Sequence, residues 1–210
     1  MTVLDYERDG GAIYAASFAT IRREADLGAV APDLEPVVVR MIHASGDIDI
    51  VDLVEASPDL VPSARRALAA GRPIWCDSNM VAHGVTRSRL PADNDVRCCL
   101  GDEGIAESAL RAGNTRSAVA VDRWLADLDG AVAVIGNAPT ALFRLLELVL
   151  DGAARPAAII GIPVGFIGAA ESKRALAMLP HRIPYVTVHG RRGGSAMAAA
   201  AVNALASTKE

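Results

Sequence analysis

Residues 131–162 read AVAVIGNAPTALFRLLELVLDGAARPAAIIGI, and this stretch decides the fold class. Two short aliphatic runs, Ala131–Ile135 and Ala157–Ile162, flank the segment 139–151, which has the length and the apolar spacing of a helix. Aliphatic runs without polar alternation are typical of strands that are buried on both faces of a parallel sheet. The stretch therefore predicts a strand, a helix and a second parallel strand.

The same rhythm continues on both sides of this unit. Further strands are predicted at 73–77, 96–100 and 184–188, and further helices at 58–71, 103–112, 115–128, 170–179 and 194–207. The sequence thus predicts an α/β fold with a mostly parallel five-stranded sheet and helices on both faces. A helical N-terminal segment of about 70 residues would pack on the sheet or form an arm on a partner subunit. No linker divides the chain, so residues 1–210 are expected to form one domain.

The N-terminal segment begins with a predicted amphipathic helix at 11–27. Ile13, Ala16, Ala19 and Ile21 recur at roughly helical spacing and are expected to form its buried face. Ser17 lies in the middle of this helix, where a hydroxyl usually points to solvent or bonds to its own turn.

A second N-terminal helix carries the stretch 40–47, RMIHASGD. Asp33 is expected to cap its start, and Gly46 is a natural stop because glycine adopts the left-handed conformation without a steric penalty. His43 therefore falls in the last turn, where unpaired carbonyls favour the imidazolium, and Arg40 shares its face. An imidazole beside a fixed cation suits proton donation to an anionic substrate. The alternative is that His43 only caps the helix or packs beneath a loop.

Composition excludes several classes of function. A net charge of −4 and a pI near 5.6 argue against a general nucleic-acid binder, and no window approaches the ~20 apolar residues of a membrane span. The basic residues are 19 Arg and 2 Lys. Some of these arginines could bind carboxylates or phosphates with forked hydrogen bonds, while compositional bias is the alternative for the rest.

The cysteines and the acidic residues predict no metal site. The three cysteines lack metal-ligand spacing, and no secretory segment opens the chain, so we expect a cytoplasmic, reduced protein. The segment 47–55 holds four acidic residues, but they alternate with aliphatic ones as in a short structured segment with one solvated face.

Ligands of a doubly wound sheet bind beyond the carboxyl ends of its strands. Three predicted strands end in glycine-containing loops, at 136–140, 161–168 and 189–195, and each loop opens a helix. Glycines at such turns let backbone N–H groups and the helix dipole meet an anion. The loops predict a pocket for a ligand with several carboxylates.

The same loops could suggest a dinucleotide site or a hydrolase. A dinucleotide fingerprint should follow the first strand and have an acidic ribose partner about 20 residues later, which these late loops lack. A phosphate-binding GxxxxGK[ST] loop is absent, and Gly193-Gly194-Ser195 lacks the closing glycine of a hydrolase elbow.

Four blocks together are more specific than any single motif. They are Arg40–Asp47, Gly136–Ala141, Gly161–Lys173 and Gly190–Leu205. Their residues, order and spacing resemble precorrin-8X methylmutase of cobalamin biosynthesis, over nearly the whole chain.

The resemblance implies an isomerase that moves a methyl group from C11 to C12 of precorrin-8X and yields hydrogenobyrinate. It implies a homodimer that binds a corrin-type tetrapyrrole and uses no cofactor, and a related enzyme acts on cobalt-precorrin-8. His43 would be the proton donor and acceptor, while Ser17 and Arg40 would contact the substrate. The role of Ser17 follows from the resemblance alone.

Further substrate contacts are predicted near the loops. Arg116, Arg191 and Arg192 are expected to bind carboxylates, and Thr86 and Asn137 complete the predicted set. Two alternatives stay open. A non-catalytic corrinoid carrier would keep these contacts without needing His43, and a nucleotide-dependent oxidoreductase would bind a dinucleotide.

Overall fold

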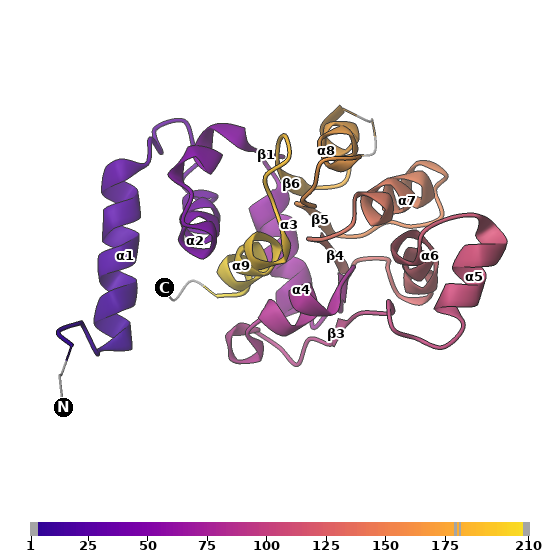
Figure 1. The fold of residues 1–210 in the computed structure, drawn as a ribbon, viewed down its shortest axis with the longest axis horizontal. Helices are drawn as coiled ribbons and strands as arrows, with labels where there is room; N and C mark the ends of the chain where they lie inside the picture. Colours follow the sequence, from indigo (N-terminus) through magenta and orange to yellow (C-terminus); the bar gives the residue numbers. More distant parts are fainter. Residues whose placement is uncertain (1–3, 179, 181, 208–210) are drawn as a thin grey trace.

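Figure 1 shows a computed structural model of the chain, which describes residues 4–178, 180 and 182–207. Its centre is a six-stranded sheet with the strand order β1-β6-β5-β4-β2-β3. The strands are β1 (Val54–Ala56), β2 (Ile74–Cys76), β3 (Val96–Arg97), β4 (Val132–Ile135), β5 (Ala158–Gly161) and β6 (Tyr185–Val188). Neighbouring strands are parallel, except that β1 pairs antiparallel with β6.

Helices cover both faces of the sheet (Figure 1). The α-helices are α1 (Gly10–Glu24), α2 (Glu35–Ser45), α3 (Leu60–Ala69), α4 (Asn79–Gly84), α5 (Ile105–Ala112), α6 (Arg116–Asp122), α7 (Pro139–Leu150), α8 (Ala169–Met178) and α9 (Ser195–Ala206). Three 3₁₀-helices are η1 (Ile48–Leu53), η2 (Arg87–Arg89) and η3 (Arg123–Ala126). None of the helices in the described part of the chain combines the length and the apolar character that a membrane span requires.

Strand β4 shows why the aliphatic runs predicted the fold. Val132 and Val134 belong to one hydrophobic cluster, whereas Ala133 and Ile135 belong to a second cluster on the opposite face. Successive side chains of a strand point to opposite faces, so a strand covered on both sides must be apolar at every position. The predicted α/β class and the strand–helix–strand unit are confirmed.

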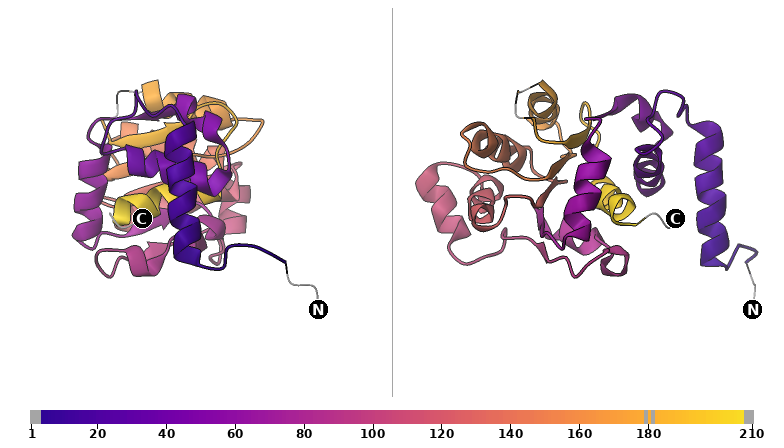
Figure 2. Two further views of the ribbon diagram at one scale, coloured as in Figure 1. Left: turned by 90° about the vertical axis from the view of Figure 1, so that its left-hand side faces the viewer. Right: turned by 180° about the vertical axis from the view of Figure 1, so that it is seen from behind.

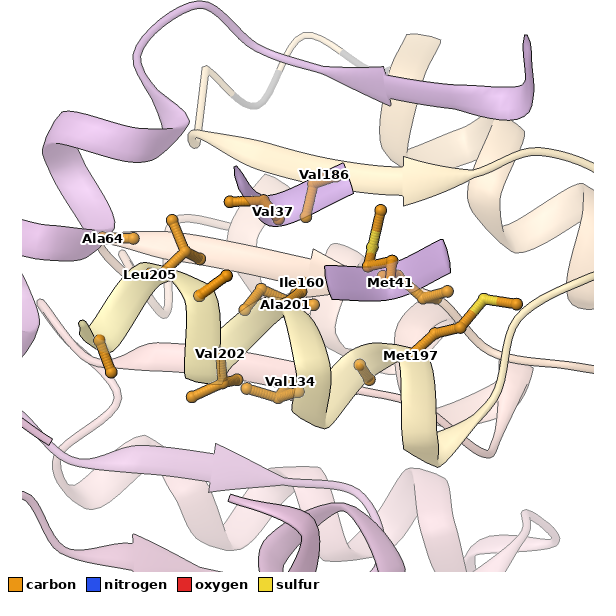
Figure 3. Packing of buried hydrophobic residues seen from close by; sticks show 14 of the residues in the cluster. Val37, Met41, Ala64, Val134, Ile160, Val186, Met197, Ala201, Val202 and Leu205 are labelled. Atoms are coloured by element: carbon orange, nitrogen blue, oxygen red, sulfur yellow. The ribbon is translucent and has the colours of Figure 1, made fainter. Parts of the chain in front are cut away.

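On one face the helices form successive layers (Figure 1). Helix α9 lies directly on β4 and β5, α2 packs on α9, and α1 packs on α2. Figure 3 shows α9 between strand and helix: Val202 lies beside Val134, while Met197 lies beside Met41 of α2. Residues Met197–Ala206 of α9 are all buried, and seven of these ten are alanine or valine, which lets neighbouring backbones approach closely.

The sheet differs from the predicted five strands by the additional strand β1. Its three residues pair with β6, with Val54 opposite Val188 and Ala56 opposite Val186. The acidic segment 47–55 predicted a structured piece but no strand, because a three-residue edge strand carries too little periodicity. Two expectations were also too long: β3 ends at Arg97, and the helix expected over 115–128 divides into α6 and η3.

Of the four residues predicted to form the buried face of α1, only Ile21 is buried. Ala16 and Ala19 are exposed and Ile13 is 46% exposed, whereas Phe18 and Ile21 are buried. Helix α1 forms the outermost layer in both views of Figure 2, so only a narrow stripe of it meets the rest of the chain. The expected cap at the start of α2 is also not formed, since the N-cap residue is Leu34 rather than Asp33.

Candidate active site

His43 lies in the last turn of α2, as the sequence predicts. The helix ends at Gly46, whose φ of 66° is left-handed and whose N–H donates to the carbonyl of Ile42. Pro36 occupies the first turn, where its missing N–H leaves no hydrogen bond unmade. The side chain of His43 is half-buried because α1 packs across it.

Three residues of α1 surround the imidazole of His43. The Oγ atom of Ser17 forms a hydrogen bond with Nδ1 of His43 at 2.8 Å. The rings of Tyr14 and Phe18 lie with their centroids 5.0 and 5.1 Å from that of the imidazole. Positions 14, 17 and 18 share one face of a helix, so α1 presents a hydroxyl between two aromatic rings.

Arg40 completes this cluster from the preceding turn of α2. Its side chain is only 9% exposed, and its guanidinium carbon lies 5.1 Å from the centroid of the Phe18 ring. Cation–π contact of this kind holds a desolvated guanidinium in place. Ser17, Arg40 and His43 are therefore brought together, although 26 residues separate Ser17 from His43 along the chain.

The electrostatics of His43 differ from the sequence expectation. The helix end was expected to favour the imidazolium, but the pKa of His43 is lowered from its usual value. Burial is the main cause, and repulsion by the Arg40 guanidinium is the second. The resting imidazole is therefore predominantly neutral at pH 7, so that one nitrogen can accept a proton while the other donates a hydrogen bond.

The loops at the carboxyl edge of the sheet converge on the start of α9. A β-carbon at Gly136 would lie 2.9 Å from the Cα of Ser195, so the loop after β4 touches α9. The buried carboxylate of Asp77, just after β2, accepts hydrogen bonds at 2.6–2.9 Å from the N–H groups of residues 136, 137 and 138. Burial raises the pKa of Asp77, and these three donors oppose that shift because they favour the carboxylate.

The loop after β6 reaches the end of α2. Nε of Arg192 lies 3.1 Å from Oδ2 of Asp47, and a second guanidinium nitrogen lies 3.8 Å from Oδ2 of Asp49. A cavity of about 280 Å³ lies between these elements; Ala44, Ser45, Asp47, Val164, Arg192, Gly193, Ala196 and Met197 line it. The acidic segment 47–55 thus holds Arg192 by ion pairs next to the helix that carries His43.

Two more predicted residues lie along the same edge. Arg191 places its guanidinium carbon 5.1 Å from the centroid of the exposed Phe166 ring. Asn137 is exposed, and its backbone is fixed by Asp77 beside the start of α9.

Thr86 and Arg116 are not brought to His43 within one chain. The N–H of Thr86 donates to Oδ1 of Asn203, about 10 Å along α9 from the residues that meet the end of α2. Arg116 is exposed at the start of α6, which covers the opposite face of the sheet (Figure 1). Arg116 was chosen because it lies beside a predicted loop, and that position carries no information on the face of the sheet that the loop serves.

Sequence reasoning missed Tyr14, Phe18, Asp77 and Lys173. Tyr14 and Phe18 could have been found from the sequence. Positions 14, 17, 18 and 21 recur at helical spacing just as well as the predicted buried positions 13, 16, 19 and 21. Asp77 follows a strand, where a polar residue commonly faces the ligand edge. Lys173 is one of only two lysines in the chain, and its side chain is fully buried.

The remaining chemistry-bearing groups do not form a metal or thiol site. Within the described ranges, no three His, Cys, Asp or Glu side chains are grouped closely enough to bind a metal ion. Burial raises the pKa of all three cysteine thiols, that of Cys99 to about 11, which leaves them as unreactive thiols at neutral pH.

Sequence comparison assigns the chain to a family. The profile described as CbiC, precorrin-8X methylmutase, matches residues 12–208. A protein named precorrin-8X methylmutase from Pseudomonas aeruginosa is 59% identical over 99% of this chain and 100% of that protein. A protein of the same name from Sinorhizobium sp is 56% identical over 98% of each. A protein named cobalt-precorrin-8 methylmutase from Priestia megaterium is 34% identical over 92% of this chain and 85% of that protein.

Structural comparison agrees. The precorrin-8X methylmutase from Thermus thermophilus has a TM-score of 0.85 to this chain with 38% identity, covering 93% of this chain and 94% of that one. A structure described as a precorrin-8X methylmutase related protein gives a TM-score of 0.81 with 37% identity, covering 89% of this chain and 97% of that one. The chain therefore belongs to the precorrin-8X methylmutase family, isomerases of cobalamin biosynthesis.

Proposed function

We propose that His43 is the proton donor and acceptor for migration of the C11 methyl group to C12 of precorrin-8X, which yields hydrogenobyrinate. The observation that carries this proposal is the hydrogen bond between Ser17 Oγ and His43 Nδ1 beside Arg40. The pair is half-buried and lies between two aromatic rings.

The hydroxyl of Ser17 suits a group that must both give and take a proton. When the Ser17 hydroxyl donates to Nδ1 of the neutral ring, Nε2 of His43 carries the hydrogen and donates a hydrogen bond from it. When Nδ1–H donates to the hydroxyl, Nε2 is free to accept. Ser17 thus supports both tautomers. Proton transfer to the substrate itself starts from the imidazolium, whose Nδ1–H donates to Ser17 Oγ. The lowered pKa makes this cation a stronger acid, and donation leaves a neutral imidazole whose Nε2 takes the proton back.

Proton donation to a ring nitrogen of the macrocycle would withdraw electron density from the adjacent π-system. The carbon–methyl bond at C11 breaks as the bond at C12 forms, and the proton returns to His43, so the reaction is an isomerisation with no net redox change. A positioned acid of this kind contributes about 10²–10⁴-fold. The remaining acceleration must come from holding the macrocycle in one orientation.

We assign that holding to the carboxylate-binding residues. Arg40 lies beside His43, and Arg191, Arg192 and Asn137 line the carboxyl edge of the sheet. The forked donors of arginine match the carboxylates of a corrin-type substrate and product.

We further propose a cytoplasmic homodimer. Helix α1 leaves Ile13 46% exposed, and the Tyr14 ring beside His43 is also 45% exposed; a second copy would cover this apolar surface. Thr86 and Arg116 stay in the proposed substrate-binding set, and because they lie away from His43 within one chain, the second copy would have to supply them. A monomeric elution volume at working concentration would contradict the dimer.

The substrate is proposed to be metal-free. Two relatives named for precorrin-8X share 59% and 56% identity with the chain, whereas relatives named for cobalt-precorrin-8 share 34–39%. The cobalt-containing substrate is the second candidate, and the assay below separates the two.

The test is anaerobic incubation of precorrin-8X with the wild-type protein, His43→Ala and His83→Ala, followed by ultraviolet–visible spectroscopy. His83 is exposed on α4 and serves as the matched control. We expect wild type and His83→Ala to convert the substrate, and His43→Ala to bind it unchanged. Binding without conversion by every protein would indicate a carrier, unless cobalt-precorrin-8 is converted.

A further inference from the structure

The ammonium of Lys173 is buried where the catalytic cluster does not use it. Its side chain on α8 is fully buried, and Nζ donates a hydrogen bond to the carbonyl oxygen of Arg192 at 2.6 Å. Among the residues that the structure describes, no carboxylate forms an ion pair with Lys173. Burying an amine without a counter-charge is unfavourable, so packing alone does not explain a lysine at this position.

The loop 190–194, which contains that carbonyl, is hydrogen-bonded to its surroundings at three of its five residues. The carbonyl of Arg191 accepts from the N–H of Gly165 at 3.3 Å, and the N–H of Gly194 donates to the carbonyl of Ile162 at 2.9 Å. Between these two bonds, Lys173 supplies the donor for the carbonyl of Arg192. The loop also fits closely, because a β-carbon at Gly193 would lie 2.6 Å from the carbonyl oxygen of Ile162.

This loop carries the two arginines that are proposed to bind carboxylates. The Arg192 side chain reaches the carboxylate of Asp47, four residues beyond His43, and Arg191 stacks on Phe166. The orientation of both side chains depends on the backbone from which they project. A rotated peptide at Arg192 would turn its guanidinium away from the end of α2.

We propose that Lys173 is a positioning residue that fixes the backbone of loop 190–194, so that Arg191 and Arg192 meet the carboxylates of the substrate in one arrangement. This inference rests on the proposed function of the two arginines. Lys173 does not touch the substrate, because its side chain has no exposed surface. Both the ammonium and the neutral amine carry N–H donors, so the hydrogen bond persists when the side chain titrates.

Two variants on one helix separate positioning from simple stability. Lys173→Met keeps the length of the side chain and removes its donors. Ser172→Ala is the matched control: Ser172 is equally buried, and its hydroxyl donates to the carbonyl of Ala169 within α8. Both variants lose a buried hydrogen bond, and only the first loses one to the loop.

The measurements are kcat and KM for precorrin-8X, together with hydrogen–deuterium exchange of a peptide that spans 189–195. For Lys173→Met we expect a rise in KM of about tenfold, the factor for losing one hydrogen bond of ordinary net strength, and faster exchange in the loop. Ser172→Ala should leave KM and loop exchange as in wild type. Lys173→Gln, which keeps an N–H donor on a shorter chain, should fall between Lys173→Met and wild type.

The two readouts fail in different ways. If the wild-type protein does not convert precorrin-8X, the proposed function is wrong. Hydrogen–deuterium exchange of the loop still tests whether the hydrogen bond from Lys173 fixes its backbone. The positioning role is overturned if Lys173→Met keeps KM within about twofold of wild type. It is also overturned if Lys173→Met changes KM no more than Ser172→Ala does. If Lys173→Met does not fold, wild-type kinetics of Lys173→Gln with fast loop exchange would overturn it equally.

Discussion

The buried amine of Lys173 makes the stability of the protein rise with pH in a defined window. Burial lowers the pKa of Lys173 to about 8, whereas the side chain of the unfolded chain titrates near 10.5. Between these values the unfolded state binds more protons than the folded state, so the free energy of unfolding increases with pH. Below pH 8 both states are protonated, and the full penalty of the buried charge is present.

The whole shift corresponds to about 3 kcal/mol, at about 1.4 kcal/mol for each unit of pKa. By pH 9.5, about 2 kcal/mol of it should be recovered. Lys173→Met removes the titrating group and nearly conserves its length. Burial raises the pKa of Cys76, Cys98 and Cys99, which lowers stability over the same range as the unfolded thiols ionise first. These groups are present in both proteins and cancel in the difference.

Urea unfolding at pH 7 and pH 9.5, in the presence of a reductant, measures this difference. The buried rings of Trp75 and Trp124 provide the fluorescence signal. The free energy of unfolding of wild type minus that of Lys173→Met should become more positive by about 2 kcal/mol between the two pH values. A change smaller than about 0.5 kcal/mol would refute the reasoning, because it would mean that the ammonium is as well solvated in the folded state as in water.

Three further variants test the cluster around His43 and the loop after β4. Ser17→Ala should lower kcat at least about tenfold with little change in KM, because it removes the group that sets the tautomer of the imidazole. A rise in KM as large as the fall in kcat would contradict this. Arg40→Met should raise the pKa of His43 in an NMR titration, because the repelling cation is gone, and an unchanged pKa would assign the shift to burial alone. Asp77→Ala should lower the free energy of unfolding by about 3 kcal/mol, since three backbone N–H groups lose their acceptor, and Asp77→Asn should lower it less. Equal urea midpoints for the two Asp77 variants would contradict that account.

The sequence predicted what depends on local pattern. The apolar runs of β4 and β5 and the helix between them were readable, because both faces of these strands are buried. The last turn of α2 with His43 was readable from Gly46 and the apolar spacing before it. Strand β1 was missed because its only support is pairing with β6, more than 120 residues away.

The site needed contacts that no local pattern contains. Ser17 meets His43 only because α1 packs on α2, so the resemblance to a family, and not the spacing, indicated its role. The exposed Ile13 misled the choice of buried face, since an outer helix can keep an apolar residue on its free side. Arg116 was chosen for its place beside a predicted loop and yet lies on the opposite face of the sheet from α2, because a loop does not reveal which face it serves.

The burial of α9 has a consequence for how the protein is made. This helix lies between the sheet and α2, and it is the last of the described elements to be synthesised. While the ribosome still holds it, the apolar faces of β4, β5 and α2 lack the helix that covers them. The nascent chain must therefore keep that surface away from other chains until α9 has left the ribosome, and this unit cannot complete its folding before then. A premature stop before α9 should yield an insoluble product, even though it would leave His43, Ser17 and Arg40 intact.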